Sequence, residues 1–175
     1  MVPKSSKQRF FHCPKCGGKL QYQQVVERQR LVCQNCGYVY YENPIVGVAA
    51  IVIQDGKLLL GKRSAGSTCP GLWCIPCGYV EYEEDVYDAV RREFHEETGL
   101  HIEVEKVFTA LSNFHNPNVH TVGIWFIARA VGGQLQAGDD IAEVGYFELD
   151  KLPPLAFPTD VQVIELLKKQ SKGFN

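Results

Sequence analysis

One stretch of this sequence, residues 78–100, constrains the fold and the chemistry more than any other: GYVEYEEDVYDAVRREFHEETGL. Residues 84–98 contain no glycine or proline and are rich in good helix formers, and Gly99 follows where helices commonly end in a left-handed residue. The sequence therefore predicts a helix of about four turns over residues 84–98.

Three glutamates of this helix lie on its apolar side. At about 100° per residue, Glu93, Glu96 and Glu97 fall beside the apolar stripe that contains Val90 rather than on the opposite, charged side. Carboxylates three and four positions apart repel one another, and unpaired charge is costly to bury. The cluster needs either cations beside it or a metal, and crowded oxygen ligands suit Mg²⁺ or Mn²⁺. A plain acidic surface helix is the alternative.

The spacing of defined residues over this stretch resembles the signature of the Nudix hydrolase family. The order is Gly78, Glu84, Arg92-Glu93, an apolar residue, Glu96-Glu97, Gly99 and a final apolar residue. Nine defined positions over 23 residues make a specific match. The resemblance covers about residues 44–170 and implies an α/β fold in which a mixed β-sheet lies between helices.

Near the N-terminus, four cysteines form two C-x2-C pairs with sixteen residues between them: Cys13, Cys16, Cys33 and Cys36. Two thiolates three positions apart can occupy one edge of a tetrahedron, and the glycine after each pair lets backbone amides turn toward sulfur. The pattern predicts a zinc ribbon with a structural Zn²⁺ and strands near residues 20–26, 30–32 and 38–41. Paired disulfides are the alternative, which conflicts with a cytosolic location.

Asn43-Pro44 marks the expected boundary between two domains, because proline favours extended geometry in the preceding residue. We expect a zinc ribbon over residues 1–43 and a Nudix domain over residues 44–175. Its predicted strands are residues 45–53, 57–61, 101–110, 119–130 and 144–149, with turns at 55–56, 116–117 and 132–133. A last helix over 159–169 is predicted, with Thr159 as its cap. Its predicted inward residues, together with one just upstream, are Leu155, Val161, Ile164 and Leu167.

The Nudix resemblance implies hydrolysis of a nucleoside diphosphate linked to another group, by attack of water on phosphorus. The region has no evident activated serine or cysteine nucleophile, and metal ions held by carboxylates supply the charge that phosphoryl transfer needs. Carried over by position, Glu93, Glu96 and Glu97 ligate the catalytic Mg²⁺ or Mn²⁺. Arg92 orients them by ion pairing, together with Glu84, and Gly78 lets the loop approach phosphate.

The general base is one of the box glutamates or an acid from a later loop. The later acids are Asp139, Asp140 and Glu143, of which we favour Glu143 because it immediately precedes a predicted strand. A solvated acid without a catalytic role is the alternative for each. We expect Glu97 to be indispensable for metal-dependent turnover.

A zinc ribbon ahead of a Nudix domain is similar to the NADH pyrophosphatase and FAD/ADP-ribose pyrophosphatase branches. The Ser-Gln-Pro-Trp-Pro-Phe-Pro segment of the NADH branch is absent from residues 110–121, which favours ADP-ribose or a flavin dinucleotide. Phe157 stacks on adenine or is simply core. Arg63, Lys62 and His115 are candidates for phosphate binding. A hydrolase of RNA caps or nucleoside triphosphates and a non-catalytic nucleotide sensor are the alternatives.

The remaining features bear on partners and location. Residues 1–42 hold seven Lys and Arg against two acids, but a short basic segment is usually solvated, so nucleic acid is not an expected partner. Without a membrane-spanning run or a signal peptide, the expected location is cytoplasmic. The resemblance implies a homodimer. We interpret Cys69, Cys74 and Cys77 as small packing residues, with redox or metal binding as the alternative.

Overall fold

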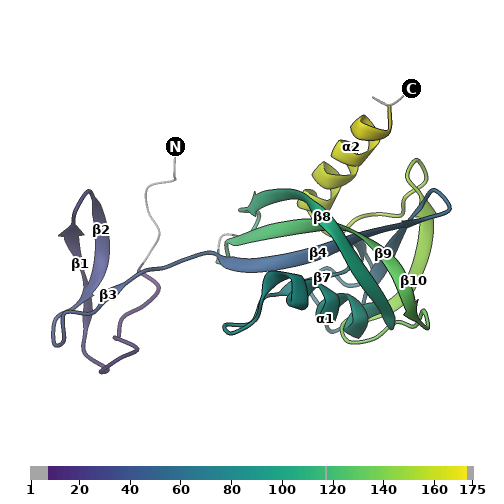
Figure 1. The fold of residues 1–175 in the computed structure, drawn as a ribbon. Coiled ribbons are helices and arrows are strands. Elements are labelled where there is room, and N and C mark those ends of the chain that lie inside the picture. Colours follow the sequence, from purple (N-terminus) through teal and green to yellow (C-terminus); the bar gives the residue numbers. More distant parts are fainter. Residues whose placement is uncertain (1–7, 117, 173–175) are drawn as a thin grey trace. The chain divides into compact units, whose positions relative to one another are not determined.

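The computed structural model describes residues 8–116 and 118–172, and the chain divides into two compact units, Met1–Asn43 and Pro44–Asn175 (Figure 1). Of the predicted turn at residues 116–117, the second residue lies outside the described part. Neither helix in the described residues is long and apolar enough to cross a membrane.

The N-terminal unit is a three-stranded antiparallel sheet of β1 (Leu20–Val25), β2 (Arg28–Cys33) and β3 (Val39–Tyr40), in that order. Leu20 pairs with Cys33 across β1 and β2, so both point to one face. Their face packs into a small core with Cys13 and Leu31, against which Phe10 and Tyr40 lie. The three strands are those that the sequence predicts.

The second unit contains a mixed seven-stranded sheet and two helices: β4 (Ile45–Gln54), β5 (Lys57–Arg63), β6 (Trp73–Cys74), β7 (Cys77–Tyr79), α1 (Val86–Thr98), β8 (Leu100–Asn113), β9 (Thr121–Gly133), β10 (Ile141–Glu148) and α2 (Pro158–Lys172). The main path is β10-β5-β4-β9-β8, with β6 paired to β5 and β7 to β4. Strands β4 and β9 run parallel, whereas the other paired strands are antiparallel. The predicted α/β class with a mixed sheet is confirmed.

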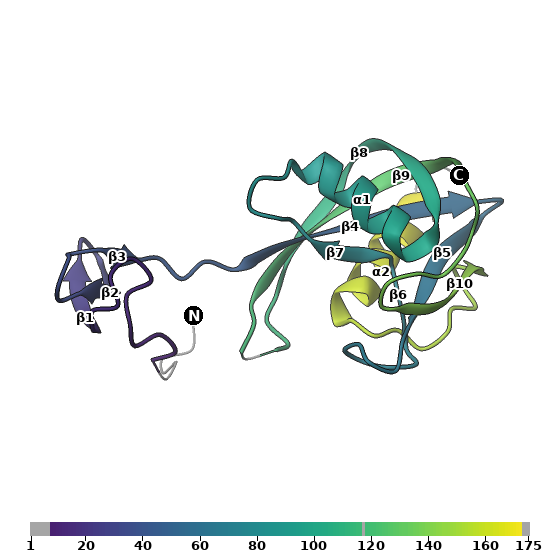
Figure 2. The ribbon, with the colours of Figure 1, turned by 90° about the horizontal axis from the view of Figure 1, so that it is seen from below.

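Each face of the sheet is covered by one helix (Figures 1 and 2). Successive residues of β4 point to opposite faces, so Val48 and Ala50 pack in the core with Phe94 of α1. Ala49 and Ile51 instead pack in a second core with residues of α2. This two-sided burial explains the continuous apolar run of β4, and it fixes α1 beneath the centre of the sheet.

Several predicted details are wrong. The two short strands β6 and β7 were not predicted, and α2 begins at Pro158, so Thr159 is a buried residue inside the helix rather than its cap. Proline fits the first helical position because its missing N–H would have no partner there. Val161 is 43% exposed, while its neighbour Val163 is fully buried and faces the core.

Candidate active site and metal centre

Helix α1 begins and ends at residues whose side chains or backbone satisfy its free polar groups. Asp85 caps it by accepting a hydrogen bond from the Tyr87 N–H at 2.8 Å, so Glu84 lies just outside the helix. Gly99 ends it with φ of 70°, and its N–H donates to the His95 carbonyl at 2.8 Å. The helix therefore presents a fixed face toward β4 and β7.

Arg92 is the centre of the charged network on α1. Its Nε and Nη2 donate to both carboxylate oxygens of Glu84 at 2.7 Å, and Nη1 donates to Glu93 at 2.8 Å and Glu96 at 3.1 Å. Hydrogen bonds from Arg92 lower the pKa of Glu84. The predicted pairing of Arg92 with Glu84 is present, and one guanidinium offsets the repulsion among three carboxylates.

Glu97 is the most buried acid of α1, with 1% of its surface exposed. It accepts a hydrogen bond of 2.7 Å from the Cys77 backbone N–H. Burial raises the pKa of Glu97 well above its usual range, and burial also raises the pKa of Glu93. Burial therefore disfavours the charged form of both carboxyls, and a cation bound beside them would favour it.

Gly78 is needed for packing against Glu93. A Cβ on Gly78 would lie 2.0 Å from the Glu93 carboxyl carbon, so any side chain would displace that glutamate. Gly78 also pairs with Val48 where β7 lies beside β4. The sequence predicts a glycine here for the approach of phosphate, whereas the structure gives the glycine a second role, as space for a carboxylate.

A cavity of about 810 Å³ lies beside Gly78, Glu93 and Glu97. Its acidic lining includes Glu93 and Glu97 of α1, and Asp139 and Asp140 from the segment before β10. Phe157 also lines it, so one hollow presents both acids and an aromatic face. The volume lies within the range of small-molecule sites.

Arg63 and Phe157 line the cavity together. Arg63 forms a two-fold ion pair with Asp140, at 2.8 and 3.1 Å, and its guanidinium carbon lies 5.6 Å from the centre of the Phe157 ring. The His115 ring stacks on Phe157 at 6.2 Å. The sequence analysis names Arg63 and Phe157 as site candidates, but the contact of Arg63 with Asp140 has no local signal, because these two residues are far apart in the chain.

Glu143 lies in β10, opposite Lys62 of β5, rather than before a strand. Its carboxylate pairs with the Lys62 ammonium at 2.9 Å, and 59% of its side chain is exposed. Among the described residues, the cavity lining includes neither Glu143, Lys62 nor Glu96. The structure thus brings Asp139 and Asp140, rather than Glu143, together with Glu93 and Glu97.

The sulfur atoms of the four N-terminal cysteines lie close enough together to share one metal ion, whereas the carboxylates of the α1 glutamates are not clustered in this way. Across residues 8–116 and 118–172, only the four predicted cysteines form a group of three or more potential ligands within 4.8 Å of one another. The carboxylates of Glu93 and Glu96 are both drawn to Arg92, which places positive charge between them. As a set of hard oxygen donors, the glutamates of α1 still fit Mg²⁺ or Mn²⁺.

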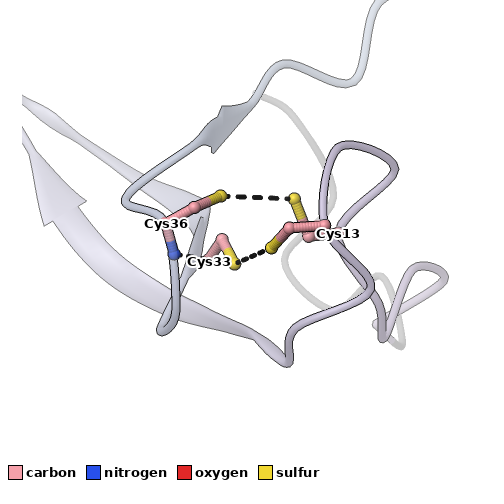
Figure 3. Close-up of side chains that lie close together, drawn as sticks. Cys13, Cys33 and Cys36 are labelled. Carbon is pink, nitrogen blue, oxygen red and sulfur yellow. Dashed lines mark hydrogen bonds between the residues drawn. The ribbon is translucent and has the colours of Figure 1, made fainter.

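The sulfur atoms of the four N-terminal cysteines, two from each C-x2-C pair, lie close together (Figure 3). Cys13 and Cys36 Sγ atoms lie 3.8 Å apart, and those of Cys16 and Cys33 lie 3.5 Å apart. A tetrahedral site with Zn–S bonds of about 2.3 Å has S···S edges of about 3.8 Å. A disulfide would need about 2.05 Å, so the geometry fits zinc and not the two disulfides.

Backbone amides support the same centre. The N–H groups of Lys15, Asn35 and Cys36 point at sulfur, at 3.4 to 3.5 Å. The amide of Cys36 is the main reason why the pKa of Cys33 falls to about 6. Hydrogen bonding with Cys16 and burial instead raise the pKa of Cys36 to about 12, so without a metal Cys33 favours the thiolate, which is the form that binds metal, and Cys36 does not.

The other three cysteines differ in exposure. Cys74 is fully buried and Cys77 half-buried in the second unit, in agreement with a packing role. Cys69 is exposed and has φ of 57°, so its prediction as a packing residue is wrong. It lies in the irregular loop between β5 and β6, where no periodic pattern indicates which side chains are buried.

Two family models match the chain. The NUDIX domain model matches residues 43–167, and the Nudix N-terminal zinc ribbon model matches residues 12–42. The chain belongs to the Nudix family. The predicted zinc-ribbon-containing Nudix architecture and the prediction of a Nudix hydrolase are both confirmed.

Similar proteins agree with this membership. An ADP-ribose pyrophosphatase of Methanocaldococcus jannaschii is 41% identical over 121 residues, which cover 69% of this Nudix chain and 71% of the relative. An NAD-capped RNA hydrolase NudC of Chromobacterium violaceum is 31% identical over 156 residues, 87% of this chain and 57% of the relative. The chain spans about half the length of the NudC relatives that it matches.

A solved structure shows the same fold over most of the chain. The crystal structure of a NUDIX hydrolase from Nitrosomonas europaea superposes with a TM-score of 0.77 at 26% identity. The match covers 89% of this chain and 88% of that one.

Proposed function

We propose that this protein is a metal-dependent Nudix pyrophosphohydrolase that cleaves the diphosphate bridge of ADP-ribose or a related dinucleotide such as FAD or NADH. One observation carries the proposal: a single cavity joins the acids Glu93, Glu97, Asp139 and Asp140 to the aromatic ring of Phe157. A nucleoside diphosphate offers an aromatic base at one end and a diphosphate that binds metal ions at the other.

ADP-ribose is the first candidate among these substrates. The relative from Methanocaldococcus jannaschii is named an ADP-ribose pyrophosphatase, and the alignment covers more than two thirds of both chains. Residues 110–121 lack the segment that the resemblance associates with NADH. Phe157, half-buried in the cavity beside His115, offers a flat surface for the adenine ring.

In this proposal, Glu93, Glu96 and Glu97 hold Mg²⁺ or Mn²⁺. Such an ion, when bound, supplies positive charge to phosphate oxygens and makes a coordinated water more acidic. Arg92 keeps Glu93 and Glu96 close to each other, with Glu84 bound on its other side. The cysteines Cys13, Cys16, Cys33 and Cys36 hold one structural Zn²⁺.

A proton must leave the attacking water, and the cavity favours Asp139 over Glu143 as its acceptor. Asp139 and Glu93 both line the cavity, and the pKa of Glu93 is raised by burial and, to a smaller extent, by the charge of Asp139, whereas Glu143 is paired with Lys62 outside the lining. Asp140 is already bound by Arg63. A carboxylate within reach of the water satisfies the geometric requirement for a general base.

The experiment is a panel of ADP-ribose, FAD, NADH and NAD⁺, incubated with Mg²⁺ or Mn²⁺ and separated by chromatography. We expect metal-dependent release of AMP, fastest from ADP-ribose. Glu97→Gln should reduce turnover at least about 100-fold, the scale of losing a metal ligand or base. Failure to release AMP from every compound, with either metal, would contradict the proposal.

The second candidate is hydrolysis of NAD-capped RNA. The observation that favours it is the similarity to NudC proteins, which extends over 87% of this chain in one case and so includes at least part of the N-terminal unit. Adding a short NAD-capped RNA to the panel decides between the two, since the preferred substrate is the one with the higher kcat/KM. A sensor without activity is disfavoured, because all the carboxylates of the signature are present.

We also propose the domain limits 1–43 for the zinc ribbon and 44–175 for the Nudix domain, which agree with the division into compact units. A cytoplasmic location and a homodimeric state are part of the same proposal. Light scattering on the purified protein measures the oligomeric state directly.

A further inference from the structure

The segment between β9 and β10 carries the two acids Asp139 and Asp140 and is tied down on both sides. On one side, the N–H of Gly138 donates to the carbonyl of Glu97 at 3.1 Å, which attaches the segment to α1. On the other side, the N–H of Ser64 donates to the carbonyl of Asp140 at 2.8 Å, which attaches it to the end of β5. Asp139 lies between these two attachments.

The second attachment is reinforced by Arg63, which is only 8% exposed. Its Nη1 and Nη2 bind both carboxylate oxygens of Asp140, at 3.1 and 2.8 Å. Its Nε and Nη2 also donate to the backbone carbonyl and the hydroxyl of Thr68, each at 3.1 Å. Most of the guanidinium donors are therefore engaged by the protein itself.

A role for Arg63 as a direct phosphate ligand conflicts with these contacts. A phosphate could form a two-fold contact with the guanidinium only by displacing Asp140 or Thr68, and loss of the first would leave a carboxylate in the cavity without its cation. A two-fold ion pair between a buried arginine and a carboxylate instead fixes the direction of both groups. The Phe157 ring, 5.6 Å from the same guanidinium, is supported by it as well.

We infer that Arg63 is a positioning residue: it holds Asp140, and through it Asp139, against the glutamates of α1, and it does not bind substrate phosphate. The inference rests on the proposed hydrolysis and assigns a role within that same site. Arg63 thus connects the acidic lining of the cavity to the aromatic ring on which the base would stack.

Steady-state kinetics with ADP-ribose test this inference in Arg63→Lys, Asp140→Asn and the double variant. Lysine keeps the charge but cannot form the two-fold pair. We expect Arg63→Lys to lower kcat at least about tenfold, since small misplacements of catalytic groups are costly, while KM changes less than about threefold. We expect the double variant to be no slower than Asp140→Asn alone, because both changes break one pair.

The matched control is Arg129→Lys, which alters an exposed ion pair with Glu103 between β8 and β9. Its kcat and KM should stay within about twofold of the wild type. A readout independent of activity is amide hydrogen exchange without substrate: exchange at residues 138–141 should accelerate in Arg63→Lys and stay unchanged in Arg129→Lys.

The opposite result is a raised KM with unchanged kcat in Arg63→Lys, additive with Asp140→Asn and without faster exchange at residues 138–141. That outcome would assign Arg63 to phosphate binding and overturn the inference, while the proposed hydrolysis would stand on the wild-type activity. An inactive wild type would instead reject the hydrolysis. If Arg63→Lys does not fold, Asp140→Asn alone decides, because unchanged kcat and exchange in it also overturn the inference.

Discussion

Arg92 shows how a single side chain makes a costly arrangement of charge stable. Glu84 and Glu93 have only 17% and 14% of their side chains exposed, and each would be expensive to bury without a partner. The planar guanidinium binds both and also reaches Glu96, which a lysine could not do with the same geometry. The charge balance of α1 therefore depends on the identity of this residue and not on its charge alone.

Gly78→Ala tests the contact between β7 and Glu93. The new Cβ would lie 2.0 Å from the carboxyl carbon of Glu93, so we expect displacement of the glutamate, a loss of about 1–3 kcal/mol in unfolding free energy and at least a tenfold loss of kcat. Chemical denaturation and ADP-ribose hydrolysis measure the two effects. Gly66→Ala is the control, since its Cβ meets nothing within 4 Å. Equal behaviour of the two variants would refute the packing argument.

The raised pKa of Asp160 should make the unfolding free energy of the protein depend on pH. Asp160 lies in the first turn of α2, 2% exposed, and burial raises its pKa to about 7 although the N–H of Ile75 donates to it. Between about pH 4, the unfolded value, and pH 7, the folded state holds a proton that the unfolded state has released. Stability from this group therefore falls as pH rises through that window, by at most about 1.4 kcal/mol per pH unit.

Asp160→Asn removes this titration, so its stability relative to the wild type should rise between pH 4 and pH 7 and then level off. Thermal or urea unfolding at several pH values measures the difference. Asp150→Asn, at a carboxylate whose side chain is 91% exposed, should leave the slope unchanged. A difference between Asp160→Asn and wild type that does not vary with pH would contradict the assignment.

At the scale of elements, the zinc ribbon and α1 depend on different interactions. The ribbon strands bury few apolar side chains, so the four thiolates must contribute much of their stability through the metal. Helix α1 instead packs Ala89, Val90 and Phe94 into a large core, so we expect it to remain folded without a ligand.

Cys33→Ser should therefore abolish the binding of one zinc per chain and unfold β1 to β3, while α1 and the large sheet persist. Zinc content by atomic absorption and amide exchange across residues 8–43 measure both. Cys69→Ser provides the control, because Cys69 is exposed and lies outside the cluster. Retention of stoichiometric zinc by Cys33→Ser would show that the cluster is not the zinc site.

Elements marked by a long apolar run or a local motif could be predicted from the sequence. Elements that form only by pairing with residues far away in the sequence could not. The apolar run of β4 and the stop at Gly99 are readable locally, and so are the paired cysteines. Strand β6 has two residues and exists because Trp73 pairs with Lys62 of β5, which no local pattern records. Glu143 and Asp139 look alike in sequence, and only the register of β10 against β5 separates the exposed acid from the acid in the cavity.

At the scale of the whole molecule, the Nudix unit is a sheet whose two faces are both covered, and Glu93 and Glu97 of α1 lie against β7. Because both faces are covered, the polar groups of the site meet at one side of the sheet. The cavity opens there, and residues of β4, β7 and β9 line it. The fold and the family could be predicted from one signature. The partners of Arg63 required the three-dimensional structure, because β5 and the segment before β10 meet only in space.

We expect Glu93 and Glu97 of α1 to bind a divalent ion in this cavity. Anomalous diffraction from crystals of the wild type soaked in Mn²⁺ tests it directly. We expect a manganese peak within about 2.3 Å of carboxylate oxygens of Glu93 and Glu97, and no such peak in Glu97→Gln. Crystals in which manganese is absent from these carboxylates, with Arg92 still joined to Glu93 and Glu96, would contradict it.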